Sequence, residues 1–315
     1  MHPTADIRIL FVFRTDGHGK GCIPYRQIAS LESYPISMGV YPLKNSGLFG
    51  YFKAFFSLRK YLKGKNYSII HAHYGLSGML LMGHNSAKRI CSLMGSEVYN
   101  GVFLRLLLRF FAAKVWDLSI VKSVKMQKLI HGSIVLPNGV NTEMFKPLPR
   151  EFSREELRLD KAKFYILFVA VNPLAKVKNI TLAREAVKKM NSGQAELLVV
   201  SGKDPEELRL YYNAADVLII TSLTEGSPNV LKEALACDLN VVSVDAGDAW
   251  EHISGIEGCI RVSYDAASIA NALLKIKNHP VSCHGREYCM KHLDEKIIAG
   301  NLWKEYNKLL KSTEK

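Results

Sequence analysis

Short apolar runs alternate with amphipathic stretches along most of the chain. Short apolar runs bounded by polar or glycine-rich segments indicate buried strands, and apolar positions three and four residues apart indicate helices. In the first half, strands are predicted at 7–13, 67–73, 118–123 and 133–140, and helices at 23–33, 52–66 and 101–114. In the second half, strands are predicted at 164–171, 195–202, 216–222 and 240–246, and helices at 179–190, 207–215, 228–237 and 294–311.

The alternation of strand and helix predicts the fold class, because strands separated by helices form parallel sheets covered on both faces. Residues 137–161 interrupt the series with prolines, glycines and a charged run, which is typical of a linker. We therefore expect an α/β protein with two Rossmann-like, doubly wound parallel-sheet domains that face a central cleft. The N-terminal domain should cover 1–150 and the C-terminal domain 151–315, with the last helix packing across the junction.

The net charge of +13 is confined to the first half of the chain. Residues 1–150 hold 20 Lys and Arg against 6 Asp and Glu, which gives +14, and residues 151–315 hold 22 against 23, which gives −1. Such a one-sided excess indicates an anionic partner: a nucleic acid, an anionic membrane surface or a phosphorylated acceptor. The sequence has no helix-turn-helix, zinc-finger or RNP-like pattern, so a nucleic acid is not expected.

Several signals of other protein classes are missing from the sequence. No apolar run approaches the ~18–20 residues of a membrane span, and the N-terminal run has neither the basic stretch nor the cleavage site of a signal peptide. The six cysteines form no CxxC pair, so a metal site is not expected. These features predict a cytoplasmic protein with reduced thiols and no cofactor.

The segment after the strand predicted at 216–222 carries the strongest chemical signal. Ser227 is a good N-cap for the next helix, and Pro228 stands where proline is favoured at the first helical position. The backbone N–H groups of Asn229 and Val230 are then free at the positive helix end, where a diphosphate can bind. In an open parallel sheet, ligands bind at this carboxyl end of the strands.

Two carboxylates flank this helix start, since Glu225, followed by Gly226, precedes it and Glu233 lies within it. The Glu-x7-Glu block resembles the donor-site motif of glycosyltransferase family 4, the group 1 glycosyl transferases. The segment NPLAKVKNITLAREAV resembles the basic loop of that family, which ends in a lysine, here Lys178. PNGVNTEMFKP resembles the junction between the two domains of the family, and IIHAHYG resembles a strand end of its first domain.

The resemblance implies a GT-B fold, a nucleoside-diphosphate sugar as donor, no metal, and retention of the anomeric configuration. Glu225 would contact the donor sugar and stabilise the developing oxocarbenium ion, Glu233 would accept the ribose hydroxyls, and Lys178 would neutralise the departing diphosphate. The wording of the motifs is closest to members that build bacterial surface polysaccharides, which indicates a saccharide or lipid-diphosphate-saccharide acceptor. The further donor-binding positions are Gly21, Asn172, Lys176, Gly226, Ser227, Asn229 and Val230.

The chain departs from the family pattern at two positions. Asn172 stands where many members have arginine, so Lys176 would supply the second positive charge. Met94 stands where many members have the histidine of an HGxD segment, which leaves that role open. His73, Ser96 and Glu97 are the candidates on the acceptor side. For the histidines at this strand end, a hydrogen-bonded core position is the alternative to a contact with the acceptor.

Two other functions remain open at this point. A GT-B nucleotide-sugar epimerase would use the same kind of site, and incubation with donor alone distinguishes it because a transferase requires an acceptor. A non-catalytic scaffold or nucleic-acid-binding module would explain the charge without the donor motif.

The basic first half also contains a segment suited to a lipid surface. Residues 52–65 combine aromatic side chains with lysines and an arginine, as in helices that lie peripherally on an anionic leaflet. Residues 102–114 have a similar composition, but we expect their apolar side chains to pack mostly on the sheet. The expected location is the cytoplasm, with peripheral attachment to the inner face of the membrane.

Overall fold

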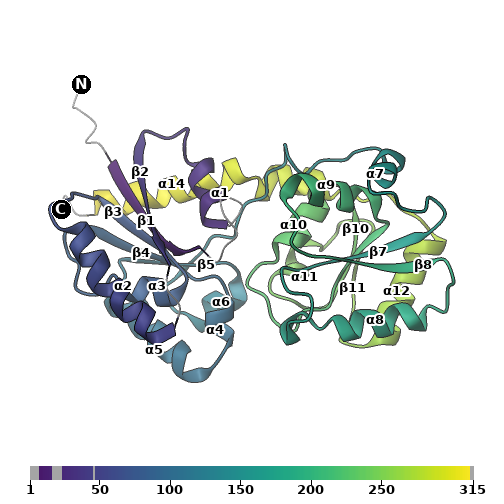
Figure 1. Ribbon diagram of the computed structural model, residues 1–315, viewed down its shortest axis with the longest axis horizontal. Helices are drawn as coiled ribbons and strands as arrows, with labels where there is room; N and C mark the ends of the chain where they lie inside the picture. The colour runs from purple at the N-terminus through teal and green to yellow at the C-terminus, as the bar shows by residue number, and fades with distance from the viewer. Residues whose placement is uncertain (1–6, 16–22, 45–46, 313–315) are drawn as a thin grey trace. The chain divides into compact units, whose positions relative to one another are not determined.

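The computed structural model describes the chain except for residues 1–6, 16–22, 45–46 and 313–315. The chain divides into two compact units, Met1–Asn138 with Lys296–Lys315, and Gly139–Glu295 (Figure 1). Residues 139–150, which the sequence analysis assigned to the first domain, group with the second unit. The last helix is grouped almost entirely with the first unit.

The first unit is built on a parallel sheet, which has six strands in the described part of the chain, in the order β2-β1-β3-β4-β5-β6. Its strands are β1 (Ile7–Arg14), β2 (Ile36–Leu43), β3 (Ile69–His73), β4 (Lys88–Ser92), β5 (Leu118–Val121) and β6 (Ile134–Val135). Its helices are α1 (Ile23–Ser30), α2 (Gly47–Leu62), α3 (Gly75–Met79), α4 (Ser96–Tyr99), α5 (Val102–Lys114), α6 (Val124–Leu129) and α14 (Glu295–Lys311).

Side-chain alternation along the strands divides the core of this unit between the two faces of the sheet. Ile9 and Phe11 of β1 belong to the apolar cluster that also contains α14. Leu10 of β1 belongs to the cluster on the other face, where Leu58 and other residues of α2 are buried. Cys91 and Val121, from β4 and β5, pack with residues of α5 on that same face. Helices α2 and α5 therefore cover one face of the sheet and α14 covers the other.

The second unit contains a parallel sheet of five strands among the described residues, in the order β11-β10-β9-β7-β8. Its strands are β7 (Phe164–Val169), β8 (Ala195–Val200), β9 (Val217–Ile220), β10 (Asn240–Ser243) and β11 (Cys259–Arg261). Its helices are α7 (Arg150–Glu156), the 3-10 turn η2 (Lys176–Lys178), α8 (Ile180–Lys189), α9 (Pro205–Ala214), α10 (Asn229–Ala236), α11 (Ala249–His252), α12 (Ala266–Asn278), α13 (Gly285–Tyr288) and the π-helical turn η3 (Cys289–Leu293). The predicted α/β fold class with two Rossmann-like parallel sheets is confirmed.

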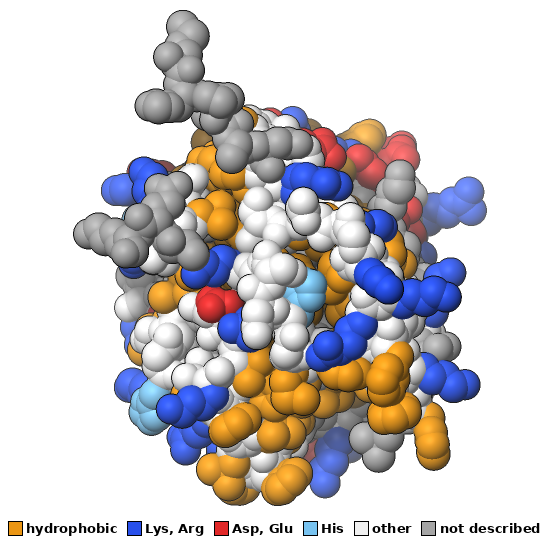
Figure 2. All heavy atoms as spheres, turned by 90° about the vertical axis from the view of Figure 1, so that its left-hand side faces the viewer, with side chains coloured by type: hydrophobic (Ala, Val, Ile, Leu, Met, Phe, Trp, Pro, Cys, Tyr) orange, Lys and Arg blue, Asp and Glu red, His pale blue; other side chains and the backbone are white. Residues whose placement is uncertain are grey.

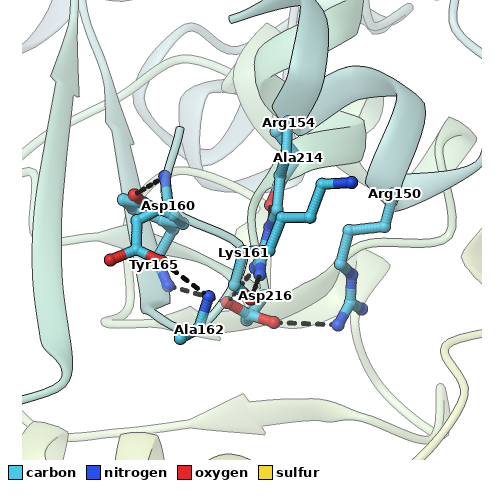
Figure 3. A network of polar contacts seen from close by, with 8 residues as sticks. All are labelled: Arg150, Arg154, Asp160, Lys161, Ala162, Tyr165, Ala214 and Asp216. Carbon is cyan, nitrogen blue, oxygen red and sulfur yellow. Dashed lines mark hydrogen bonds and ion pairs between the residues drawn. The ribbon is translucent and has the colours of Figure 1, made fainter. Parts of the chain in front are cut away.

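Helix α7 lies in the segment that the sequence analysis interpreted as a linker. The boundary between the two units falls inside this segment, after Asn138, but its later residues are folded as part of the second unit. Arg154 of α7 forms an ion pair with Asp216, at 2.8 Å between Nη2 and Oδ2, and Arg150 reaches the other carboxylate oxygen at 2.9 Å (Figure 3). The backbone N–H of Tyr165 also donates to Asp216, at 2.7 Å. The other two nitrogens of the Arg154 guanidinium donate to the backbone carbonyls of Ala214 and Lys161. The charged run thus anchors α7 at the amino ends of β7 and β9.

Candidate functional site

The candidate site is at the opposite edge of the same sheet, where the carboxyl ends of β7, β9 and β10 lie side by side. The chain passes from β7 to β8 on one side and then to β9 on the other, so the strand order reverses between β7 and β9. Such a reversal separates the loops that follow the two strands, and ligands of open α/β sheets bind at this point.

Backbone hydrogen bonds join the loops that follow β7 and β9. The N–H of Leu223 donates to the carbonyl of Val177 at 2.8 Å. The hydroxyl of Thr221 lies 3.0 Å from the carbonyl oxygens of both Lys178 and Asn179. Asn179 has φ of 51°, in the left-handed region that asparagine tolerates, and this turns the chain from η2 into α8. The position of Lys178 is therefore set by the end of β9.

Lys178 and Glu225 are in contact across these loops, because the Lys178 Nζ donates to Glu225 Oε1 in an ion pair. Both side chains are partly exposed, so a ligand can reach them. The sequence analysis assigned these residues to the chemistry of the reaction, and the fold brings them together from positions 47 residues apart.

Residues that follow β10 and β11 pack against the loop that carries Glu225. Gly247 has φ of 60°, and a Cβ at that position would lie 2.9 Å from the carbonyl oxygen of Gly226 and 3.0 Å from that of Glu225. Tyr264 donates from its hydroxyl to the carbonyl of Ser222 at 2.9 Å. Burial raises the pKa of Tyr264, and nearby carboxylates add to the effect, so the phenol stays a donor. Close backbone packing fixes the Glu225–Gly226 peptide.

Helix α10 begins at Asn229, one residue later than the sequence analysis predicted. Pro228 is the N-cap residue, with an extended ψ of 118°, and no side chain caps the helix. The expectation of Ser227 as N-cap with Pro228 at the first helical position was wrong. Proline has no N–H to satisfy, so its ring fits the turn before the helix as well as the first turn itself. Asn229 and Val230 remain partly exposed in the first turn.

A buried polar chain lies next to this turn. His252 Nε2 is 2.9 Å from Asp248 Oδ2, and its Nδ1 is 2.9 Å from the hydroxyl of Tyr288. Burial acts to raise the pKa of Asp248, but His252, the charge of Lys232 and the hydroxyl of Ser227 outweigh it, so the net pKa is lowered. The sequence analysis missed this group, although Asp248 and His252 are four residues apart, the spacing of neighbours on one face of a helix.

The remaining donor-side candidates are more dispersed. Glu233 is buried within α10 and accepts a hydrogen bond from the hydroxyl of Tyr212 at 2.9 Å. Asn172 is exposed, and its side chain accepts from the N–H of Leu174 at 3.2 Å. Lys176 is exposed on the same short turn as the site lysine. Gly21 lies outside the described residues.

The acceptor-side candidates are in the first unit, around a cavity of about 620 Å³. His73 and Ser96 line this cavity, together with Met94, the residue that replaces the family histidine. The other described lining residues are Phe13, Arg14, Ile23, Pro24, Gly47, Tyr51, Tyr74 and Leu76. The lining is mainly apolar and aromatic, with one arginine among these residues.

Glu97 is buried and organises the backbone beside the cavity. Its carboxylate accepts from the N–H groups of Met94 at 2.8 Å, Gly95 at 3.1 Å and Gly75 at 3.2 Å. Burial raises the pKa of Glu97 in spite of these bonds. The described contacts of this side chain are therefore with the loop that shapes the cavity wall.

The two histidines of β3 differ in their partners. His71 is a core residue, with Nδ1 at 2.6 Å from the hydroxyl of Tyr306 and Nε2 at 2.8 Å from that of Ser92. Burial lowers the pKa of His71 to about 3, and the charge of Lys122 adds to this. His73 Nε2 lies 2.5 Å from Oε1 of Gln27, and burial lowers its pKa well below the usual value. Both imidazoles are therefore neutral at physiological pH.

Metal clusters and membrane-spanning helices are both absent from the described residues. No group of three or more His, Cys, Asp or Glu side chains is arranged to hold a metal ion in the described part of the chain. Among the same residues, no helix combines the length and the apolar character required to cross a bilayer.

Comparison with known proteins gives similarities in sequence and in structure. Residues 181–279 match the family model "Glycosyl transferases group 1", which confirms the resemblance noted in the donor motif. The "Putative teichuronic acid biosynthesis glycosyltransferase TuaC" of Bacillus subtilis (strain 168) is 26% identical over 252 residues, which are 68% of this chain and 62% of the relative. The chain thus spans less than two thirds of the length of that relative.

Solved structures show the fold over nearly the whole chain. Sucrose-phosphate synthase from Thermosynechococcus elongatus superposes with a TM-score of 0.83 at 18% identity, covering 97% of this chain and all of the other. Anabaena HepE in complex with UDP and glucose superposes with a TM-score of 0.71 at 15% identity, covering 96% of this chain and all of the other. The predicted GT-B fold is confirmed.

Proposed function

We propose that this protein is a retaining glycosyltransferase that moves a hexose from a nucleoside-diphosphate sugar to a saccharide acceptor in surface polysaccharide synthesis. The observation that carries the proposal is the contact between Lys178 and Glu225 at the point where the strand order reverses. A cation and a carboxylate held together beside a helix start match the two charges of the reaction, an anionic leaving group and a cationic sugar.

The donor diphosphate is proposed to bind at the start of α10. The first-turn N–H groups, at Asn229 and Val230, lie at the positive end of the helix dipole. Lys176 is near enough in the chain to add a second positive charge beside Lys178. Glu233 would accept the ribose hydroxyls, exchanging its bond with Tyr212 for bonds to the nucleotide.

The proposed reaction breaks the bond between the anomeric carbon and the β-phosphate oxygen and forms a bond from the same face to an acceptor hydroxyl. The proton of that hydroxyl passes to a diphosphate oxygen. Lys178 stabilises the charge on the departing diphosphate, and Glu225 stabilises the oxocarbenium-like sugar. Because the lysine and the helix start supply positive charge, the step is proposed to require no metal.

The acceptor is proposed to bind in the cavity of the first unit. His73 and Ser96 present polar groups on an otherwise apolar and aromatic wall, as in sites that bind a sugar face on an aromatic ring. Arg14 on the same wall suits a phosphate, which favours a lipid-diphosphate-saccharide as acceptor. The relationship to a protein named for teichuronic acid biosynthesis supports an acceptor of this class.

Thermal unfolding with a panel of nucleotides tests the donor site first. UDP, GDP, ADP and their sugars are compared, and a nucleotide at 100 times its Kd should stabilise the protein by about 2.7 kcal/mol. The donor that stabilises the protein is then incubated with and without saccharide acceptors. Transfer only in the presence of an acceptor supports the proposal, whereas a new nucleotide sugar formed from donor alone would identify an epimerase. No stabilisation by any nucleotide would contradict the donor site itself.

A further inference from the structure

Two helices of the first unit each present a second apolar stripe to solvent. Helix α2 buries Leu58 and Leu62 but exposes Phe49, Phe52 and Phe56. Helix α5 buries Leu108 and Phe111 but exposes Phe103, Leu106 and Phe110, at the same spacing of three and four residues. Phe49 and Phe103 are 84% and 82% exposed. The expectation that α5 packs its apolar side chains mostly on the sheet was therefore wrong for half of the helix.

The two stripes belong to one surface, because both helices cover the same face of the six-stranded sheet. The segment 75–82 contacts both helices. The carbonyl of Met82 accepts from Arg59 of α2 at 2.5 Å, and Gly75 lies against Leu108 of α5. Met82 is itself exposed. Figure 2 shows hydrophobic side chains gathered in the lower part of the view, on the side where Figure 1 places α2 and α5. We call this the α2–α5 surface: Phe49, Phe52, Phe56, Met82, Val102, Phe103, Leu106 and Phe110.

The stretch of sequence that carries the α2–α5 surface is strongly basic, with Arg89 paired to Asp117. Between Glu32 and Asp117 the sequence contains a single acidic residue, Glu97, and its side chain is buried. The same stretch contains eleven basic residues: Lys44, Lys53, Arg59, Lys60, Lys63, Lys65, Lys88, Arg89, Arg105, Arg109 and Lys114. Lys and Arg side chains border the apolar side chains in Figure 2.

We infer that the α2–α5 surface docks on an anionic lipid bilayer, with the exposed phenylalanines entering the acyl boundary and the basic side chains contacting the headgroups. Exposed apolar patches of this kind mark interaction surfaces, and aromatic groups bordered by lysines and arginines fit the bilayer interface. The positive charge argues against a second copy of the chain, because two identical basic surfaces would repel each other. The inference deepens the proposed function, since a lipid-linked acceptor stays in the membrane.

Vesicle co-sedimentation tests the surface without donor or acceptor, so its result is separate from that of the glycosyltransferase proposal. Vesicles of phosphatidylcholine alone are compared with vesicles containing about one third phosphatidylglycerol. Each basic residue near an anionic leaflet contributes about fivefold in partitioning, so binding to anionic vesicles should exceed binding to neutral ones by at least ~100-fold. In 1 M salt the Debye length falls to about 3 Å, and most of that difference should disappear.

Two sets of variants locate the contact. Lys53→Glu with Lys60→Glu and Lys63→Glu should lower anionic binding by at least ~100-fold, and Phe52→Gln with Phe103→Gln should lower it by at least ~10-fold. The matched controls are in the second unit, where Lys188→Glu with Lys189→Glu, and Phe152→Gln, alter exposed residues of the same types. Neither control should change binding. In Phe103→Trp, brominated acyl chains should quench the added fluorescence.

Three results would overturn the inference. These are equal binding to neutral and anionic vesicles, anionic binding that survives charge reversal on α2, or no quenching in Phe103→Trp. Sedimentation velocity without lipid supplies a further check. A dimer that dissociates in Phe52→Gln with Phe103→Gln would assign the surface to a second copy instead.

Discussion

In the second unit, one ion pair lies at the amino ends of the strands and another at their carboxyl ends, and the two pairs differ in their surroundings. At the amino ends of β7 and β9, Arg154 and Asp216 are 7% and 12% exposed, and each nitrogen of the guanidinium donates to a protein oxygen. At the carboxyl ends, Lys178 and Glu225 are 28% and 19% exposed. One pair is enclosed by backbone partners, and the other faces the site.

Left-handed residues lie near both pairs, so close packing of the backbone is what distinguishes them. The amino-end pair joins a helix to the starts of two strands, and Arg158, just after that helix, has φ of 54°. The carboxyl-end pair lies on loops that include left-handed Asn179 and the close approach of Gly247. Exposed charged side chains on a closely packed loop are expected where a ligand must be held, whereas an enclosed pair has no access to a ligand. We therefore assign stability to the first pair and function to the second.

The largest effect should come from the amino-end pair. Arg154→Met leaves Asp216 buried without its main counter-charge, so the free energy of unfolding should fall by about 3–5 kcal/mol. Arg150→Met is the matched control, because Arg150 pairs with the same carboxylate from an exposed position and should cost only ~0–1 kcal/mol. Urea unfolding measures both. Equal losses in the two variants would remove the distinction between buried and exposed partners.

At the carboxyl-end pair, substitutions should lower turnover and leave the free energy of unfolding nearly unchanged. Glu225→Gln and Lys178→Ala should each lower turnover by at least ~100-fold, the scale of a lost electrostatic contact in a transition state, with little change in stability. Glu196→Gln is the control, because Glu196 forms an ion pair with Lys163 beside the starts of β7 and β8. Its turnover should equal that of the unaltered protein. Near-normal rates in either site variant would make our assignment of that residue incorrect.

The sequence predicted the elements near the site well, because their signals are local. The apolar runs of β7, β9 and β10 and the Glu-x7-Glu block can each be recognised within about ten residues, and so can the basic loop with Lys178. Strands β2 and β4 were missed for physical reasons. Strand β2 contains Gly39 and Pro42 and lies at the sheet edge, and β4 begins with Lys88 and Arg89.

Contacts between distant segments could not be predicted in the same way. The partners of Arg154 come from α9, the start of β9 and the turn before β7. Because most of them are remote in the sequence, the charged helix could not be distinguished from a linker by its composition. The close packing of Gly247 against the Glu225–Gly226 peptide likewise depends on the order of strands in the sheet. The same limitation explains the exposed stripe of α5, because a helix with apolar residues on most sides does not reveal which side the sheet covers.

Gly247 offers a smaller effect that sharpens the comparison. Gly247→Ala places a Cβ against two carbonyl oxygens of the site loop and should lower turnover by about tenfold, about the loss of one well-placed contact. Gly202→Ala is the control, since Gly202 has a similar φ of 68° but nothing within 4 Å of the added Cβ. Both variants should lose about 1 kcal/mol of stability from backbone strain. A tenfold loss of turnover in both would show that the loop contact is irrelevant.

Glu233 should affect binding instead of chemistry. Ribose contacts are present in the ground state and the transition state alike, so Glu233→Ala should raise the donor KM by several-fold, about 1 kcal/mol, while kcat changes little. Tyr212→Phe removes the hydroxyl that donates to Glu233 and leaves the carboxylate in place, so its donor KM should stay the same or fall. Steady-state kinetics with varied donor measures both parameters. A loss confined to kcat in Glu233→Ala would place this carboxylate at the reacting sugar instead.

The smallest expected effect is that of a chelator, which should leave the rate unchanged. The carboxyl-end site has its own positive charges for the departing diphosphate, the Lys178 ammonium and the N–H groups at the start of α10. A divalent cation would have to compete with Lys178 for the same phosphate oxygens, so we expect no requirement for one. Initial rates are measured after dialysis against EDTA and again after addition of Mg²⁺ or Mn²⁺. Loss of activity that either ion restores would show that the lysine does not suffice. The Lys178–Glu225 pair would then hold the loop in place, as the Arg154–Asp216 pair holds α7.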